Sequence, residues 1–367
     1  MFIHVAPALS PVDYLKAVAA PPVIEQPGHR YFSHARGALI TALYSIAAAA
    51  GAASPAPVWI PAYACDTVAV LLEAYGIPYH FYPITRSLTP DWPALERSSI
   101  ARGDTFVLVH FFGFPLATES ARAFCRARGC SLIEDVAHGI VSRIVPGGIG
   151  THGVAAVFGL RKLLPVPDGG MLYSAQLKFH PPTFEPEASS IARSVPRMLA
   201  QWAMQRAGVS RPGAVPVIDK QVLPQQPDHY YHFRYLQNAS DWSRKIVAVL
   251  DLDAVIAARR RNYQWLVDEL RRLSRFDVPD SLTLADPQAV PMGVYAHCDD
   301  SERIINALNR DGVPAAAAPA LHPAVFRSAL WPVENAMYLE AVMLPVHQDL
   351  GERELSAIVA SVRRHAL

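Results

Sequence analysis

Residues 154–173, VAAVFGLRKLLPVPDGGMLY, hold two short apolar runs on either side of a basic pair and an Asp-Gly-Gly turn. The runs at 154–158 and 170–173 are typical of buried strands, because they are short, apolar and bounded by turn residues. The segment between them is too short to contain a crossover helix. The two runs therefore predict a sheet with at least one antiparallel pair.

Four more strand-like runs precede this stretch, and helical patterns lie between some of them. The helical patterns cover residues 65–76 and 117–129, and Gly129 is well suited to end the second. Strands alternating with helices in this order predict a mostly parallel α/β sheet. The earlier strand-like runs are 58–60, 79–82, 105–110 and 131–135.

The second half of the chain changes character twice. Residues 180–240 are rich in proline and irregular apart from a predicted helix at 188–208. A strongly helical stretch follows and leads into a C-terminal α+β pattern. We therefore expect a large α/β domain over 1–245, with the loop-rich segment inside it, and a small α+β domain over 246–367.

Composition excludes several classes of protein. The chain has 367 residues, of which 51% are hydrophobic, and 33 basic and 32 acidic residues give a net charge of +1. Such balance favours neither nucleic acid nor an anionic membrane as a partner. Residues 37–65 are uncharged, but glycine and prolines interrupt them, so they predict no membrane span. With no signal peptide at the N-terminus, we expect a cytoplasmic protein.

Four cysteines in a chain of this length do not form a disulfide framework. Cys125 and Cys130, in CRARGC, lack the second pair that a zinc site requires, and we interpret them as ordinary buried thiols. A metal site at His229 and His232 is also not expected, because the spacing places no third ligand. The sequence predicts no bound metal.

The segment 148–153, GIGTHG, spells the glycine pattern of a dinucleotide-binding turn. That turn must follow a strand and open a helix. Here the pattern comes before a predicted strand, in the middle of the chain. The sequence therefore argues against a Rossmann site.

Three other features each have a functional and an ordinary interpretation. Asp135 follows a strand, where open α/β sheets bind ligands, but it could also cap a helix or form a buried ion pair. Lys162, one of only five lysines, stands among apolar residues that would lower its pKa, but it could also extend to the surface. Arg36 and Gly37 open a helix and suit an anion, although Gly37 could simply permit close packing.

The order of these features is more informative than any one of them. Pyridoxal 5′-phosphate (PLP) needs an anion site for its phosphate, a lysine for its aldehyde and an acid for its pyridine nitrogen. Arg36–Gly37, Lys162 and Asp135 are residues of these three kinds. Together they predict a PLP site.

At this point the sequence resembles the DegT/DnrJ/StrS-type aminotransferases, fold-type-I PLP enzymes that often act on keto sugars. The resemblance extends from about residue 33 to the end. It implies a seven-stranded, mostly parallel sheet and a homodimer with a shared active site. The segments that carry it are VWIPAYACDTVAVLLEAYGIPYHFYPI (58–84), VLVHFFGFP (107–115), LIEDVAHG (132–139), GIGTHGVAAVFGLRKLLPVPDGGML (148–172), GVPAAAAPALHP (312–323) and LPVHQDL (344–350).

The resemblance also implies roles for particular residues. Lys162 would hold the cofactor as a Schiff base and transfer the proton, and Asp135 would pair with the pyridine nitrogen. His138 would contact the phenolic oxygen. The remaining implied contacts are Arg36 and Gly37 with the phosphate, Tyr63 or Cys65 with the ring face, Asn238 with the partner subunit's cofactor, and His322 with the substrate.

Two departures from the family pattern affect the expected site. The serine that usually precedes the lysine and binds phosphate is absent, since its candidate places hold Val157 and Gly159. Substitutes for its hydroxyl could be Ser33, Thr67 and Ser240. Residues 315–318 are four alanines where many sugar enzymes carry basic and aromatic residues, which removes cations that a diphosphate would use.

The expected activity is transfer of an amino group from a donor such as glutamate to a keto sugar, with a nucleotide-linked sugar as the first candidate. The alanine run favours an alternative, a smaller carbonyl acceptor without a nucleotide. A third interpretation, a PLP-fold binding protein without catalysis, is supported by the missing serine and opposed by the presence of Lys162, Asp135 and His138.

Overall fold

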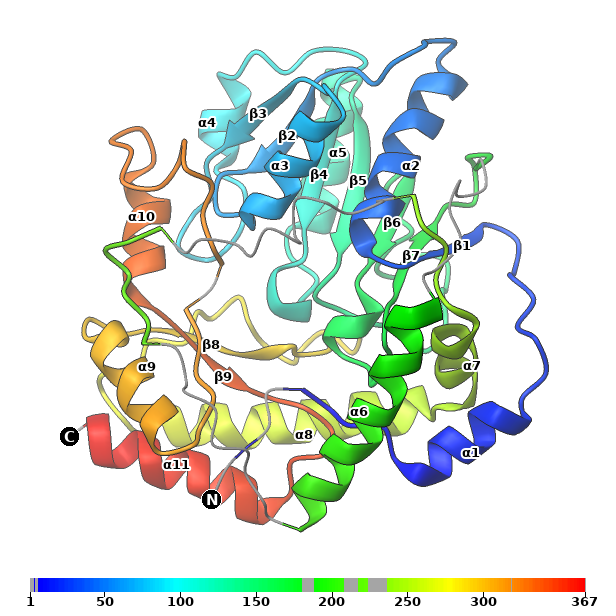
Figure 1. The fold of residues 1–367 in the computed structure, drawn as a ribbon. Coiled ribbons are helices and arrows are strands. Elements are labelled where there is room, and N and C mark those ends of the chain that lie inside the picture. The colour runs from blue at the N-terminus through cyan, green and yellow to red at the C-terminus, as the bar shows by residue number, and fades with distance from the viewer. Residues whose placement is uncertain are drawn as a thin grey trace.

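The computed structural model describes residues 3, 6–179, 188–207, 217–223, 236–317 and 319–366 (Figure 1). In this part of the chain the named strands form one sheet of seven and one of two. The larger sheet contains β1 (His29–Phe32), β2 (Val58–Pro61), β3 (Tyr79–Tyr82), β4 (Thr105–Val109), β5 (Ser131–Val136), β6 (Ala155–Phe158) and β7 (Gly170–Tyr173).

The larger sheet has the strand order β1-β7-β6-β5-β4-β2-β3. Strands β2 to β6 are parallel to one another, whereas β7 runs antiparallel to both β6 and β1. The six predicted strands and the mixed character of the sheet are confirmed. The reversal at β7 has the expected cause, because only a short turn separates it from β6.

Strand β1 is the element that the sequence analysis missed. Its residues, His29 to Phe32, do not alternate between apolar and polar side chains, and only Phe32 is buried. The strand forms because β7 offers an edge, with Phe32 opposite Gly170. Its pairing is thus a tertiary effect that no local pattern indicates.

Helices connect the strands of the larger sheet and cover it. Helix α2 packs against β1, β6 and β7, and α5 packs against β4 and β5. Helices α3 and α5 confirm the two predicted helices, and Gly129 ends α5 with φ +72° as expected. The helices up to the irregular segment are α1 (Pro11–Ala19), α2 (Ala35–Ala49), α3 (Asp66–Ala74), α4 (Trp92–Glu96), α5 (Thr118–Arg128) and α6 (Ala188–Arg206), with short 3₁₀ turns η1 (Phe111–Gly113) and η2 (Leu160–Lys162).

The smaller sheet pairs two antiparallel strands from the last quarter of the chain. Helix α9 packs against α11 and α10, and α8 contacts β8 and α11. These elements are α7 (Asp241–Val249), α8 (Leu252–Leu270), β8 (Gly293–His297), α9 (Ser301–Arg310), α10 (Pro332–Glu340), β9 (Ala341–Pro345) and α11 (Glu352–Ala366). The division at 245/246 falls inside α7 and stays a prediction.

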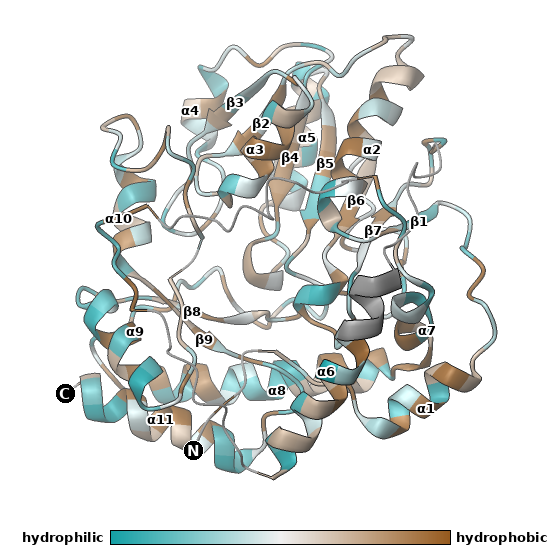
Figure 2. Cartoon of the chain, in the orientation of Figure 1, coloured by the Kyte–Doolittle hydropathy of each residue, from teal (hydrophilic) through white to brown (hydrophobic). Residues whose placement is uncertain are grey.

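Hydrophobic residues gather on the central strands and the inner sides of the helices, whereas the outer sides of α9 and α11 are mostly hydrophilic (Figure 2). The buried residues form one large cluster, spanning both sheets, and a smaller one around η2, β6 and α7. No helix among the described residues is long and apolar enough to cross a membrane. The predicted helix at 188–208 is confirmed by α6, but most of the irregular segment around it lies outside the described residues.

Candidate active site

The two residues expected to carry the chemistry lie at the carboxyl ends of adjacent strands. Asp135 is near the end of β5, where it pairs with Val157 of β6, and Lys162 closes the turn η2 that follows β6. The turn lies close against the loop after β5, because a Cβ at Gly159 would be 2.4 Å from the carbonyl oxygen of Ala137. The fold therefore brings this acid and this lysine to one edge of the sheet, where such sheets bind ligands.

Lys162 is an amine without a structural partner. Its side chain is exposed, and no hydrogen bond or ion pair joins it to another residue in the described part of the chain. Protein atoms nevertheless surround it, so burial lowers its pKa. The charges of Arg161 and Arg36 also lower this pKa, whereas Cys65 and Asp135 raise it. This combination favours an uncharged, nucleophilic amine facing open space.

Asp135 is held in one orientation by its own loop. Its Oδ1 accepts a hydrogen bond of 2.8 Å from the backbone N–H of Ala137. Burial raises its pKa, whereas that N–H and the charge of Lys162 act in the opposite direction. A positive group placed beside Asp135 would favour its ionised form.

His138 is fixed as a hydrogen-bond donor. Its Nδ1 accepts the backbone N–H of Phe112 at 3.2 Å, and its ring lies parallel to that of Phe112, with centroids 5.8 Å apart. Burial lowers its pKa well below the usual value, and the charge of Lys162 lowers it further. The neutral ring then carries its proton on Nε2, so that atom donates.

The start of α2 adds positive charge to the same region. Burial and the charges of Arg161 and Arg36 lower the pKa of His34, the residue before α2, to about 3. Gly170 brings β7 against this helix end, since a Cβ there would be 2.2 Å from the carbonyl carbon of His34. Arg36 and Arg161 therefore place two cationic groups near the N-terminus of a helix, which favours an anionic ligand.

The two candidates for the ring face occupy different positions. Cys65 stands at the N-cap of α3, influences the pKa of Lys162, and accepts a hydrogen bond of 3.2 Å from Thr67 Oγ1. Tyr63 is fully buried, and its hydroxyl lies 2.9 Å from that of Tyr295 in β8. Cys65 thus influences the amine of Lys162, whereas Tyr63 links the two sheets, and which of them contacts the ring stays a prediction.

Asn238 and His322 come from segments other than the two strand ends that carry Asp135 and Lys162. Asn238 forms an isolated bridge with Phe32, at the edge of the sheet beyond β1. His322 packs against the ring of Phe81, and its Nε2 lies 3.3 Å from Glu73. Their expected contacts, with the partner's cofactor and with the substrate, stay predictions.

The two positions at which the family serine could stand offer no hydroxyl for a phosphate. Val157 is buried in the core, and Gly159 has no room for a side chain. Of the possible substitutes, Thr67 lies beside Cys65, and Ser33 contacts His34 at 3.0 Å. Ser240 caps α7 and hydrogen-bonds Asp168.

Sequence reasoning missed Arg161 and His34, which shape the electrostatics of the site. Arg161 stands next to Lys162, so its position was visible, but its influence on His34 depends on the approach of β7 to α2. Among the described residues no cluster of three or more His, Cys, Asp or Glu side chains could hold a metal. His229 and His232 lie outside the described residues.

Comparison with solved structures defines the class. The chain superposes on the aminotransferase TlmJ of Streptoalloteichus hindustanus with a TM-score of 0.69 at 18% identity, covering 100% of this chain and 99% of that one. PseC of Helicobacter pylori, an aminotransferase involved in pseudoaminic acid biosynthesis, gives 0.68 at 14% identity, covering 99% and 98%. The chain has the fold of the fold-type-I PLP-dependent aminotransferases, as expected.

Comparison of sequences narrows this class. Residues 78–179 match the model of the DegT/DnrJ/EryC1/StrS aminotransferase family. Over 92 residues the chain is 34% identical to a dTDP-4-dehydro-2,3,6-trideoxy-D-glucose 4-aminotransferase of Saccharopolyspora spinosa, a match that covers 24% of each protein. The match thus spans about a quarter of that relative's length. The resemblance to this family is confirmed over the segment that contains Asp135 and Lys162.

Proposed function

We propose that the protein is a PLP-dependent aminotransferase that moves an amino group from a donor such as glutamate to the carbonyl of a keto sugar. The observation that carries the proposal is the amine of Lys162, which has no partner among the described side chains and a lowered pKa beside Asp135. Sugar aminotransferases among the structural and sequence relatives support the choice of acceptor.

The residues present fit PLP. An amine without an ionic partner suits a covalent bond to an aldehyde, and a half-buried acid at 135 suits a protonated pyridine nitrogen. Arg36 and Arg161 near the start of α2 suit the phosphate. Bound PLP would supply an electron sink for the bond-breaking step.

The side chains would divide the work as their positions dictate. Lys162 would bind the cofactor and then carry a proton to and from the reacting carbon, because burial lowers the pKa of its amine. Asp135 would keep a proton on the pyridine nitrogen. His138 Nε2 would donate to the phenolic oxygen, since Nδ1 already accepts from Phe112.

Within this reaction the nucleotide-linked keto sugar is the first candidate acceptor, and a smaller carbonyl compound is the second. The second is favoured by the alanine run, where Ala315 is buried and Ala316 pairs with Met343, so this stretch offers no cation. We further propose a cytoplasmic homodimer with a shared site, as in the family that it resembles.

Absorbance spectra test the proposal. The wild type reconstituted with PLP should be yellow and should bleach on addition of glutamate, whereas Lys162→Ala should bind PLP without turning over. Lys178→Ala is the matched control, because Lys178 lies after β7 away from η2, and it should behave as the wild type. A wild type that stays colourless with added PLP would refute the proposal and leave a binding role.

A further inference from the structure

The end of helix α5 holds two cysteines against each other. Gly129 adopts φ +72°, and the backbone N–H groups of Gly129 and Cys130 both bond the carbonyl oxygen of Cys125, at 2.8 and 3.1 Å. This is the helix ending in which the side chains at the two positions, five residues apart, make contact. The second bond also keeps the two Cα atoms within about 7 Å, as a disulfide requires.

The two thiols differ in reactivity. Cys125 is buried and Cys130 is half-buried, and both are free. The contact between the two thiols lowers the pKa of Cys130 and raises the pKa of Cys125. Burial raises the pKa of Cys130 and the charge of Arg128 lowers it, and the net pKa of Cys130 is lowered. Cys130 is thus the group that would react first, and Cys125 is placed to react with it second.

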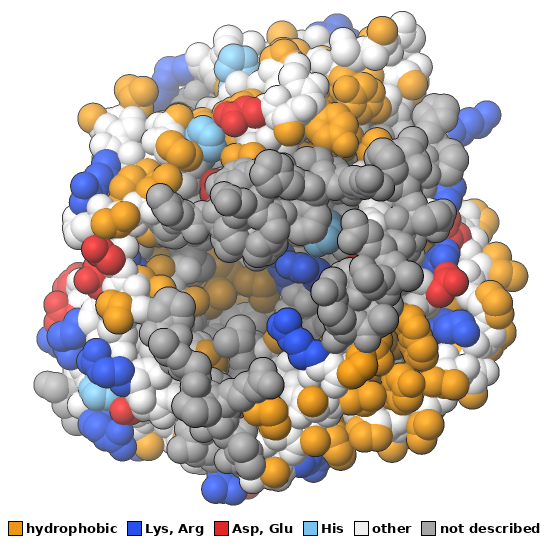
Figure 3. Space-filling view, in the orientation of Figure 1, with side chains coloured by type: hydrophobic (Ala, Val, Ile, Leu, Met, Phe, Trp, Pro, Cys, Tyr) orange, Lys and Arg blue, Asp and Glu red, His pale blue; other side chains and the backbone are white. Residues whose placement is uncertain are grey.

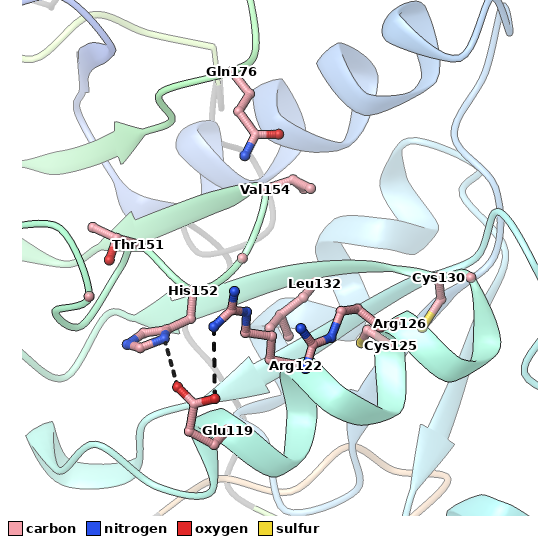
Figure 4. Close-up of a pocket in the computed structure, with 13 residues that line it drawn as sticks. Glu119, Arg122, Cys125, Arg126, Cys130, Leu132, Thr151, His152, Val154 and Gln176 are labelled. Carbon is pink, nitrogen blue, oxygen red and sulfur yellow. Dashed lines mark ion pairs between the residues drawn. The ribbon is translucent and has the colours of Figure 1, made fainter.

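Both cysteines line a pocket of about 680 Å³ (Figure 4). On the opposite side of this pocket, Glu119 pairs with His152 at 3.4 Å and with Arg122 at 3.9 Å, while Arg126 lies on the side of the cysteines. The pocket is therefore lined by two arginines, of which Arg122 pairs with Glu119 and Arg126 lies nearer the sulfur atoms. Leu132 and Val154, which line it too, lie at the amino ends of β5 and β6, so it opens at the sheet edge opposite Lys162.

We propose that Cys125 and Cys130 form a reversible dithiol–disulfide site whose oxidant is a small anionic disulfide of the glutathione type. The Cys130 thiolate attacks one sulfur of glutathione disulfide, which forms a mixed disulfide and releases one glutathione thiolate. Cys125 then loses its proton and attacks Cys130 Sγ, which releases the second glutathione. Two protein thiols are oxidised and one disulfide is reduced, so electrons balance. The site does not depend on the proposed transaminase activity.

Peptide mapping of the whole protein tests the disulfide. Trypsin cleaves after Arg122, Arg126 and Arg128, so a disulfide would join the peptide of residues 123–126 to the peptide that begins at Gly129. Treatment with glutathione disulfide should give this linked pair, and dithiothreitol should separate it. The control Cys298→Ser should give the same pair, because Cys298 is buried elsewhere.

Single variants identify the order of the two steps. In Cys125→Ser the mixed disulfide should accumulate on Cys130, whereas in Cys130→Ser the thiol at Cys125 should stay reduced. On unmodified wild type, phenylarsine oxide, which binds paired thiols, should bind once and protect both cysteines from alkylation. A lasting glutathione adduct on wild-type Cys130 without the linked pair, or two thiols that stay reduced, would overturn the proposal.

The role of the basic pocket has its own test. Arg126→Gln should slow the reaction with glutathione disulfide about two- to fivefold at low salt, because it removes a charge that attracts the anionic oxidant. The reaction with neutral hydroxyethyl disulfide should keep its rate. Equal slowing with both oxidants would show that Arg126 does not select an anion.

Discussion

Lys162 and Lys220 show how the same side chain serves two purposes. The ammonium of Lys220 is almost fully buried and donates to Ser301 Oγ at 2.7 Å and to three carbonyl oxygens at the end of α10. Burial lowers its pKa to about 7, but those oxygens satisfy its protons. Lys162 has no such set within the described chain. Lys220 is therefore a structural cap, and Lys162 is the amine that remains for chemistry.

A first prediction concerns the charge next to Lys162. Replacing Arg161 by Gln removes a positive charge that lowers the pKa of Lys162, so that pKa should rise. The measurement is the pH dependence of acetylation of Lys162 by acetic anhydride in PLP-free protein, followed by peptide mapping. The midpoint should move to higher pH.

The control for this experiment is Arg353→Gln, on the exposed side of α11. It removes the same charge far from the site and should leave the acetylation midpoint of Lys162 unchanged. If both variants behave as the wild type, the guanidinium of Arg161 does not influence the amine, and the prediction is wrong.

At the scale of elements, one carboxylate organises the loop before β6. Glu134, on β5, is fully buried and accepts backbone N–H groups from Gly150, His152 and Gly153 at 2.7–3.0 Å. It also accepts from His110 Nε2 at 3.1 Å, since His110 Nδ1 already accepts from the backbone. The glycine pattern at 148–153 thus binds a carboxylate of the protein itself. The loop precedes strand β6, which agrees with the prediction that it is no Rossmann turn.

Glu134→Gln should destabilise the protein by about 2–4 kcal/mol, because an amide presents a donor to groups that are themselves donors. The loss is measured by urea unfolding at neutral pH. Burial raises the pKa of Glu134, but His110 and the backbone N–H groups outweigh it, so the net pKa is lowered from 4.5. Its stabilisation is therefore full above pH 4.5 and is lost as pH falls through the folded-state value.

The wild type should accordingly lose more stability on acidification below pH 4.5 than Glu134→Gln does. Glu119→Gln is the matched control, because Glu119 pairs with His152 of the same loop but its side chain is 71% exposed. Its cost should stay below about 0.5 kcal/mol. A similar loss in both variants would mean that burial of the carboxylate does not matter.

At the scale of the whole molecule, the sequence predicted what depends on local pattern. Six strands were visible because each is a short apolar run bounded by turns, and β7 was seen to reverse because its connection is short. Strand β1 was not visible, since His29 and Arg30 pair with β7 only after the chain folds back. The strand propensity of a residue does not indicate which edge of a sheet can accept another strand.

The candidate site follows the same division. Asp135 and Lys162 could be found from the order of motifs, because strand ends of a parallel sheet meet at one edge. The contacts that hold them could not, since they join distant segments. Arg259, in α8, donates to the carbonyl oxygen of Leu163 at 2.9 Å, across 96 residues. A single arginine among 28 carries no sequence signal of that role.

Arg259 connects the lysine turn to the smaller sheet. It is almost fully buried, and its guanidinium also donates to the carbonyl oxygens of Val346 at 2.7 Å and Pro291 at 3.1 Å, beside β9 and β8. Gln348 accepts from its Nε and itself donates to Leu163. One planar group thus fixes the backbone next to Lys162 to both strands of the other sheet.

Arg259→Lys should therefore loosen the turn that carries Lys162. The four acceptors of Arg259 are spread around the three nitrogens of its guanidinium, so the single ammonium of a lysine cannot serve all of them. The cost in unfolding free energy should be about 3–5 kcal/mol. Hydrogen exchange in residues 159–169 should become faster. The control is Arg260→Lys, because Arg260 also donates to four carbonyl oxygens, but all within residues 284–289. That variant should speed exchange at 284–289 and leave 159–169 unchanged. Unchanged exchange at 159–169 in Arg259→Lys would show that the lysine turn is held without the smaller sheet.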